Sequence, residues 1–250
     1  SSAKRRGEKS TQEKRKNTKR NTLMAYYCSY ISEKYKEEWE CLAQKHPSSG
    51  FHQSFNWAKF KQADDWDSYK IGIFNEKDKL IGGAVILQFH FHSTKTNFLY
   101  IPEGPILNYD KDEELDAQWK VLETAILSIV DVGKNAKTTH FRIEPRLSIC
   151  PKWFLSKFTK APLNLQPKYT QVADLSPSQD KILSQMKPKG RYNIRLAEKK
   201  GVKITKIDTV NKKDREEFYK IYKQTFERNK FEGKQKDLFE NLMIFLFHLC

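Results

Sequence analysis

The chain has 250 residues, of which 38% are hydrophobic and 13% aromatic, so it can bury a core and is not a disordered polymer. Its formal net charge of +15 predicts a polyanionic partner such as nucleic acid, a phosphorylated substrate or an anionic membrane surface. A solvated, lysine-rich surface is the alternative. Four scattered cysteines without a CxxC pair indicate neither a zinc site nor a disulfide framework, and free thiols fit a reducing cytosol.

Residues 1–24 form a basic tail that carries +7 of the net charge and almost no apolar side chains. We expect this tail to be disordered, and because it lacks an apolar segment it is not a signal peptide. Apolar residues at helical spacing then predict a helix over Ser32–Lys45. A second helix is expected over Gln53–Gln62, with Ser54 as its N-cap.

Three strand-like runs follow, joined by short polar links that suit hairpins, so we predict an antiparallel meander. These runs are Tyr69–Asn75, Lys79–Phe91 and Asn97–Leu107. Asp112–Val132 has a single apolar stripe and acids in its first turn, which predicts a helix that Gly133 ends. A strand over Thr139–Pro145 completes a mixed α/β order.

A short helix over Pro151–Phe158 leads into a proline-containing link, where we place a domain boundary between residues 163 and 164. The first domain is therefore expected to cover residues 25–163 and the second to cover residues 164–250. In the second, the patterns predict strands over Tyr169–Leu175 and Val202–Ile207, a helix from the N-cap Ser176 to Met186, and helices over Arg191–Lys200, Asp214–Arg228 and from Asp237 onward. The apolar end of the last helix predicts a chain truncated at its C-terminus.

The helix expected over Arg191–Lys200 combines basic charge with an apolar stripe. Arg191, Arg195 and Lys199 are four residues apart and share one face, while Tyr192 and Leu196 can dock on a core. Like charges at this spacing repel, and a helix that tolerates them often contacts phosphate. Contact with phosphate or RNA and a merely solvated face both stay open.

Candidate catalytic groups are few. His90 and His92 project from the same side of a strand and are expected to be exposed strand residues, since no third metal ligand is near in sequence. Glu144 could act as a base, although pairing with Arg142 or with backbone is the favoured interpretation. The chain has no nucleophile elbow, zinc-protease motif, P-loop lysine motif or glycine-rich phosphate-binding turn, which weakens several cofactor classes together.

Five segments in order carry a resemblance to a known family. These are QSFNWAKFK (residues 53–61), IPEGPI (101–106), RIEP (142–145), the block Asp174–Val202 and ERNKFEG (227–233). With them the chain resembles the FemABX family of peptidoglycan interpeptide-bridge aminoacyltransferases, also called FemAB or methicillin-resistance proteins. The likeness runs from about Gln53 to the end, and the Asp174–Val202 block is its most specific part.

The resemblance implies an α/β (α+β) fold of two tandem GNAT-like domains, the second of which is incomplete here. It implies that an amino acid passes from aminoacyl-tRNA to the stem-peptide amine of lipid II or UDP-MurNAc-pentapeptide, without metal or coenzyme A. A cytoplasmic monomer, peripheral at the inner membrane surface, would fit that activity. We expect the truncated chain itself to be inactive.

Site residues are carried over from the resemblance by position, and it assigns no catalytic residue. Lys61 falls where the family has a lysine that meets the precursor's phosphates, and Lys234 falls where some members have an arginine in a similar role. The phosphate or tRNA contacts are expected at Lys189, Arg191, Arg195, Lys199 and Lys200. Two alternatives remain: an N-acyltransferase of the same fold that uses another acyl donor, and a non-enzymatic basic RNA-binding protein.

Overall fold

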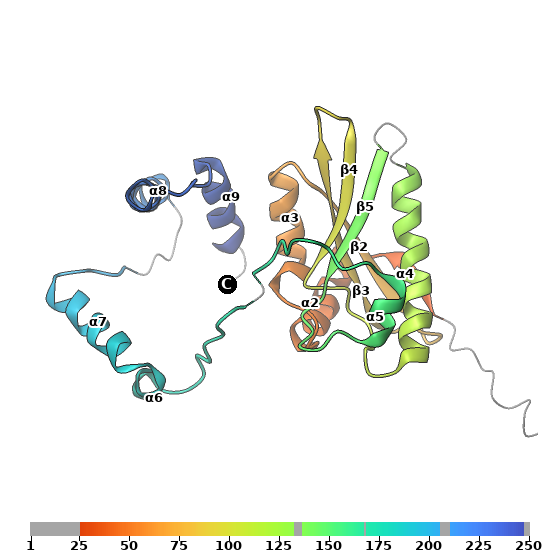
Figure 1. Cartoon of the computed structure of the whole chain (residues 1–250), viewed down its shortest axis with the longest axis horizontal. Helices are drawn as coiled ribbons and strands as arrows, with labels where there is room; N and C mark the ends of the chain where they lie inside the picture. Colours follow the sequence, from red (N-terminus) through yellow and green to blue (C-terminus); the bar gives the residue numbers. More distant parts are fainter. Residues whose placement is uncertain (1–25, 133–136, 168, 206–210, 248–250) are drawn as a thin grey trace, which may run out of the picture. The chain divides into compact units, whose positions relative to one another are not determined.

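The computed structural model describes residues 26–132, 137–167, 169–205 and 211–247 (Figure 1). The chain divides into two units between Thr159 and Lys160. This division lies four residues before the boundary expected from the sequence. The basic tail, residues 1–24, lies outside the described residues, and the assignment of residues 25–163 and 164–250 as domains stays a prediction.

The first unit is built on one five-stranded sheet in the order β1-β2-β3-β4-β5. Its strands are β1 (Tyr27–Tyr30), β2 (Asp67–Phe74), β3 (Leu80–Phe91), β4 (Thr96–Pro102) and β5 (Lys137–Glu144). Strands β1 to β4 pair antiparallel, as predicted for the meander, whereas β5 runs parallel to β4. The short edge strand β1 was not predicted, because its four residues are mostly exposed and show no alternation.

Helices cover both faces of this sheet (Figure 1). Helices α4 (Asp112–Val132) and α5 (Lys152–Lys157) pack on one face. On the other lie α2 (Lys36–Lys45), which follows a 3-10 turn at Glu33–Tyr35, and α3 (Phe55–Ala63), which follows a second at Phe51–Gln53. The unit is thus a three-layer α/β structure, and the fold class expected from the sequence is confirmed.

Strand β3 supplies side chains to both layers of the core because successive residues point to opposite faces. Ala84 and Ile86 join the cluster under α4, whereas Val85 and Leu87 join the cluster under α2 and α3. The apolar stripe predicted for α4 is confirmed in full. Its fully buried members are Leu115, Trp119, Leu122, Ile126 and Ile129.

Local signals in the first unit are also confirmed. The Ser54 hydroxyl accepts a hydrogen bond from the Trp57 N–H at 3.0 Å and caps α3 as predicted.

Strand β4 ends at Pro102, five residues before the predicted end, and Ile106 returns to pair with Gly83. Gly133, the predicted end of α4, lies outside the described residues.

The described part of the second unit contains four helices, namely α6 (Gln179–Gln185), α7 (Pro188–Lys199), α8 (Lys212–Asn229) and α9 (Lys236–Phe247). Helices α8 and α9 pack through aromatic rings, and Phe239 lies 4.5 Å from Tyr222 between ring centroids. Where burial is described in this unit, every residue is half-buried or exposed. Both helices lie within two residues of their predicted starts.

Two predicted strands of the second unit are corrected by the structure. Tyr169–Leu175 has no regular secondary structure, and neither do residues 202–205; residues 206 and 207 lie outside the described part. Both stretches are exposed, with Ile204 at 95% and Tyr169 at 84% of their full accessibility. A strand forms only when a neighbour pairs with its backbone, and no described strand is available to these segments.

Two helix starts are also corrected. Ser178, not Ser176, caps α6 and accepts from the Lys181 N–H at 3.4 Å. Ser176 lies in the bend before the helix, where the Asp174 carboxylate accepts its N–H at 2.9 Å. Helix α7 begins at Pro188, three residues before the predicted start, because proline suits the first helical position. Gly201 follows its end with φ +77°.

Candidate functional site

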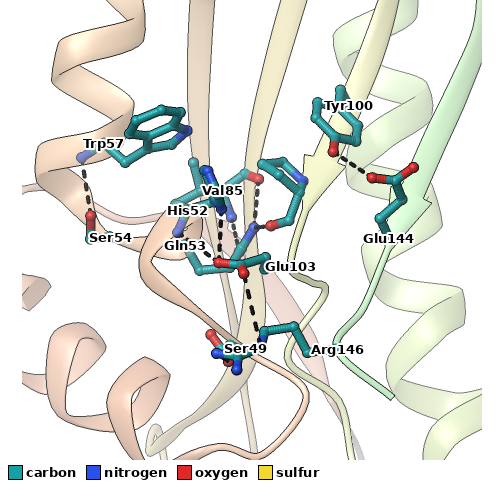
Figure 2. Close-up of polar contacts among 11 residues, drawn as sticks. Ser49, His52, Gln53, Ser54, Trp57, Val85, Tyr100, Glu103, Glu144 and Arg146 are labelled. Carbon is teal, nitrogen blue, oxygen red and sulfur yellow. Dashed lines mark hydrogen bonds and ion pairs between the residues drawn. The ribbon is translucent and has the colours of Figure 1, made fainter. Parts of the chain in front are cut away.

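A buried glutamine fixes the turn that follows β4. Gln53, fully buried, donates from its amide to the Pro102 carbonyl at 2.6 Å and accepts from the Val85 N–H at 2.8 Å (Figure 2). A Cβ on Gly104 would lie 2.7 Å from the carboxamide carbon of Gln53, so only glycine lets the turn approach this closely. One side chain therefore joins the start of α3, strand β3 and the end of β4.

Glu103 occupies this turn with its carboxylate held on several sides. Its φ of +49° is left-handed, which is uncommon for a residue with a side chain. One carboxylate oxygen lies 2.8 Å from Nδ1 of His52 and accepts the His52 N–H at 3.1 Å, and the other lies 3.9 Å from Nε of Arg146 (Figure 2). The neighbouring loop leaves room because a Cβ on Gly50 would lie 2.1 Å from this carboxylate.

These contacts determine the ionisation of Glu103. Burial alone would raise the pKa of its carboxyl, but the side chain and N–H of His52 and the charge of Arg146 outweigh it, and the pKa lies below its ordinary value. Arg146 is further placed by a hydrogen bond from its guanidinium to the Ser49 carbonyl at 3.4 Å. The turn therefore carries an ionised carboxylate at neutral pH.

A second carboxylate lies at the same edge of the sheet. Because β4 and β5 are parallel and pair Pro102 with Glu144, their carboxyl ends meet at one edge. Glu144 accepts from the Tyr100 hydroxyl at 2.7 Å and from Nε of Arg142 at 2.9 Å. The predicted pairing of Glu144 with Arg142 is confirmed.

Lys61 lies in the last turn of α3, with its side chain only 13% exposed. Its ammonium forms an ion pair with Asp64 and lies 4.6 Å from the ring centroid of Trp66 and 5.7 Å from that of Phe60. A phosphate at this position would share or replace Asp64 as the partner of the ammonium. The expected role of Lys61 in binding the precursor stays a prediction.

Lys234 lies in the connection between α8 and α9, and it is exposed. Its N–H donates to the Tyr222 hydroxyl at 2.9 Å, and its carbonyl accepts from the Tyr219 hydroxyl at 3.4 Å, so α8 fixes the backbone of this connection. The preceding Gly233 lies against the Phe226 ring, where a Cβ would come within 2.2 Å. The exposed side chain of Lys234 therefore extends from a backbone that hydrogen bonds to α8 fix in place.

The basic helix α7 does not dock as predicted. Tyr192 is 61% exposed, and no residue of α7 is buried, because the described part of the second unit offers it no sheet to pack on. The Arg191 guanidinium bonds back to the carbonyls of Met186 and Ser184, the latter at 3.4 Å. The other cations expected to meet phosphate, Lys189, Arg195, Lys199 and Lys200, are exposed.

The predicted site residues are divided between the two units. Lys61 belongs to the first unit, whereas Lys234 and the cations of α7 with its flanking Lys200 belong to the second. Their convergence on one substrate stays a prediction. Sequence reasoning missed Gln53, His52 and Glu103 as a connected group, and the only signal for it was the proline- and glycine-rich IPEGPI turn.

His90 lies in β3 and is half-buried, whereas His92 is exposed in the turn after β3, so neither is the exposed strand residue that was predicted. Both histidines are paired with carboxylates. Nε2 of His90 lies 2.9 Å from Asp67, and Nε2 of His92 lies 3.1 Å from Asp65. Within the described ranges, no cluster of three or more histidines, cysteines, aspartates or glutamates has the geometry to hold a metal ion. Among the same residues, no helix has the length and apolar character needed to span a bilayer.

The sequence of the chain is similar to that of proteins with known names. A family model described as the FemAB family matches residues 35–150 and 152–245. A lipid II:glycine glycyltransferase of Staphylococcus epidermidis is 23% identical over 219 residues, covering 82% of this chain and 50% of that protein. The protein of the same name from Staphylococcus aureus strain COL is 25% identical over 219 residues, covering 82% of this chain and 49% of its own length.

The fold has a solved counterpart. The crystal structure of FemX superposes with a TM-score of 0.64 at 19% sequence identity, covering 87% of this chain and 54% of FemX. This likeness shows the fold and supports the fold class expected above. The chain spans about half the length of the curated relatives it matches.

Proposed function

This chain belongs to the FemAB family. We propose that the protein is an aminoacyltransferase that builds peptidoglycan interpeptide bridges. The donor is an aminoacyl-tRNA, and the acceptor is the stem-peptide amine of lipid II or UDP-MurNAc-pentapeptide. The observation that carries this proposal is the family match, which extends over both units. Relatives named lipid II:glycine glycyltransferase support the choice of acceptor.

The chemistry is aminolysis of an activated ester. The neutral amine attacks the ester carbonyl, the new C–N bond forms, and the C–O bond to the tRNA ribose breaks. The amine's proton leaves and the departing ribose oxygen takes one up. The protein's main task is to align the two groups and exclude water, and such alignment supplies a large part of a rate enhancement.

The proposed contacts use the cations described above. Lys61 and Lys234 bind phosphate groups of the precursor, while α7 and Lys200 face phosphates of tRNA. Exposed arginines and lysines suit this task because each phosphate contact releases counterions. The proposed setting is the cytoplasm, with the monomeric protein at the inner face of the membrane.

A transfer assay tests the proposal. The full-length protein is incubated with tRNA charged with a labelled amino acid and with either lipid II or UDP-MurNAc-pentapeptide, and acetyl-CoA with the same amines runs in parallel. Label in the precursor supports the proposal. Transfer from the coenzyme A donor alone would favour the other acyltransferase, and tRNA binding that survives Arg195→Ala but requires residues 1–24 would favour a basic RNA-binding protein.

A further inference from the structure

Aromatic side chains of the first unit form a partly exposed surface beside Lys61. Trp66 follows α3, and its ring centroid lies 4.8 Å from that of Phe89 and 6.0 Å from that of Phe98. Phe89 in turn lies 4.9 Å from Phe91, and Phe91 lies 5.9 Å from Phe98. We call these four residues, Trp66, Phe89, Phe91 and Phe98, the aromatic strip.

The register of the sheet explains why the strip lies on one face. Phe89 pairs directly with Phe98 across β3 and β4, and Phe91 is two residues further along β3, so their side chains point to the same side. This is the side of Val85 and Leu87, which α2 and α3 cover. The β3–β4 hairpin, yellow in Figure 1, continues past the last turn of α3.

Beyond that helix the aromatic strip stays partly open to solvent. Phe91 is 43% exposed, and the other three members are half-buried. Rings that pack against one another but stay partly exposed among the described residues are the kind of surface that binds an apolar partner. The rings meet at tilted and edge-on angles, between 33° and 83° within the strip, so they do not form the flat platform on which a nucleobase stacks.

The cation at one end of the aromatic strip indicates the kind of partner. The Lys61 ammonium lies 4.6 Å from the Trp66 ring centroid, so the charge and the apolar surface are continuous. A ligand that fits both has an anionic head joined directly to a hydrocarbon chain. We propose that the aromatic strip binds the first isoprene units of a polyprenyl pyrophosphate, with the pyrophosphate at Lys61.

This inference rests on the proposed function and narrows it. Lipid II carries its sugar-peptide on a polyprenyl pyrophosphate, whereas UDP-MurNAc-pentapeptide carries the same sugar on a nucleotide. A strip that takes isoprene units therefore selects the lipid-linked acceptor. Asp64, the present partner of Lys61, is the group that the pyrophosphate displaces.

The test measures binding of soluble probes to the 250-residue chain by titration calorimetry. The probes are inorganic pyrophosphate, UDP, geranyl pyrophosphate, farnesyl pyrophosphate and farnesol. Affinity is expected to rise with chain length, and farnesyl pyrophosphate should bind at least roughly tenfold more tightly than pyrophosphate, since each buried methylene adds affinity. UDP should bind no more tightly than pyrophosphate.

Variants then show which residues are responsible for the tighter binding of farnesyl pyrophosphate. Phe91→Ser should lower the affinity for farnesyl pyrophosphate by about three- to tenfold and leave pyrophosphate unchanged, whereas Phe91→Leu should keep most of the gain. Leu127→Ser is the matched control, because Leu127 is 54% exposed on α4 at the opposite face of the sheet. Asp64→Asn should strengthen the binding of both pyrophosphates, and Lys61→Met should weaken both.

Three results would overturn the inference: farnesyl pyrophosphate binding no better than pyrophosphate, farnesol binding as well as farnesyl pyrophosphate, or a gain that survives Phe91→Ser. Failure of the proposed function looks different. In that case the transfer assay moves no amino acid to either precursor. Equal transfer to both precursors, together with binding that does not depend on isoprenoid chain length, would instead support the function and reject the role of the aromatic strip.

Discussion

The two units of the chain have similar kinds of residues but use them differently. Among the described residues, the first unit buries twenty-six hydrophobic side chains around one sheet, whereas the second buries none. Tyr192 and Ile194 are exposed on α7, and Phe218 and Ile221 are exposed on α8 even though α8 packs against α9 through aromatic rings. The comparison shows that capping and periodicity suffice to place a helix, while burial depends on partners distant in sequence.

The largest expected effect comes from the centre of the first core. Trp119→Ala removes a side chain that is 2% exposed and should lower the free energy of unfolding by about 3–5 kcal/mol, because a cavity remains. Phe239→Ala, in the half-buried ring cluster of the second unit, should cost about 1 kcal/mol. Urea unfolding followed by circular dichroism measures both, and equal losses would show that the second unit has a core of its own.

Gln53→Leu tests the buried glutamine at similar volume. It leaves the Val85 N–H and the Pro102 carbonyl without their partner and should lower the free energy of unfolding by about 3 kcal/mol. Amide exchange of Val85 should accelerate as well. A change below about 1 kcal/mol would mean that water replaces the carboxamide and that the turn does not depend on Gln53.

Helix caps give a matched pair across the units. Ser54→Ala removes a 3.0 Å cap inside the first unit and should cost about 1 kcal/mol of unfolding free energy. Ser178→Ala removes a longer, exposed 3.4 Å cap and should only reduce the helicity of α6. A larger global loss from Ser178→Ala than from Ser54→Ala would contradict the division described here.

The smallest expected effect is a pH dependence at Glu103. Its pKa is lowered from the ordinary 4.5, so its contribution to stability is present above about pH 4.5 and is lost as pH falls through the folded-state pKa. Glu103→Gln should therefore flatten the acid side of the stability profile, below the ordinary pKa of 4.5. An unchanged acid side would show that His52 and Arg146 do not stabilise the carboxylate.

Much of the fold could be predicted from the sequence, because its signals are local. The apolar stripe of α4, the Ser54 cap and the three-strand meander each follow from residues a few positions apart. The strand predicted over Tyr169–Leu175 failed for the opposite reason, since its pattern was right for a strand but a strand needs a neighbour.

The candidate site was less predictable. Lys61 was identified only through a family resemblance, and its neighbour Trp66 could be read from the sequence only as a nearby aromatic residue. The contacts of Gln53 with Val85 and Pro102 join positions 32 and 49 residues apart, which no spacing rule connects. The aromatic strip depended on the register of β3 against β4, and register is fixed by the whole sheet.

The one parallel pair in the sheet has a consequence for how the first unit assembles. Strands β1 to β4 pair as antiparallel neighbours, but β5 reaches β4 only after the chain has crossed through α4. Closing such a long loop costs more entropy than closing a hairpin. We therefore expect the hairpin of β3 and β4 to form early and locally, and the edge that holds Glu103 beside the end of β5 to be completed late, once α4 has packed.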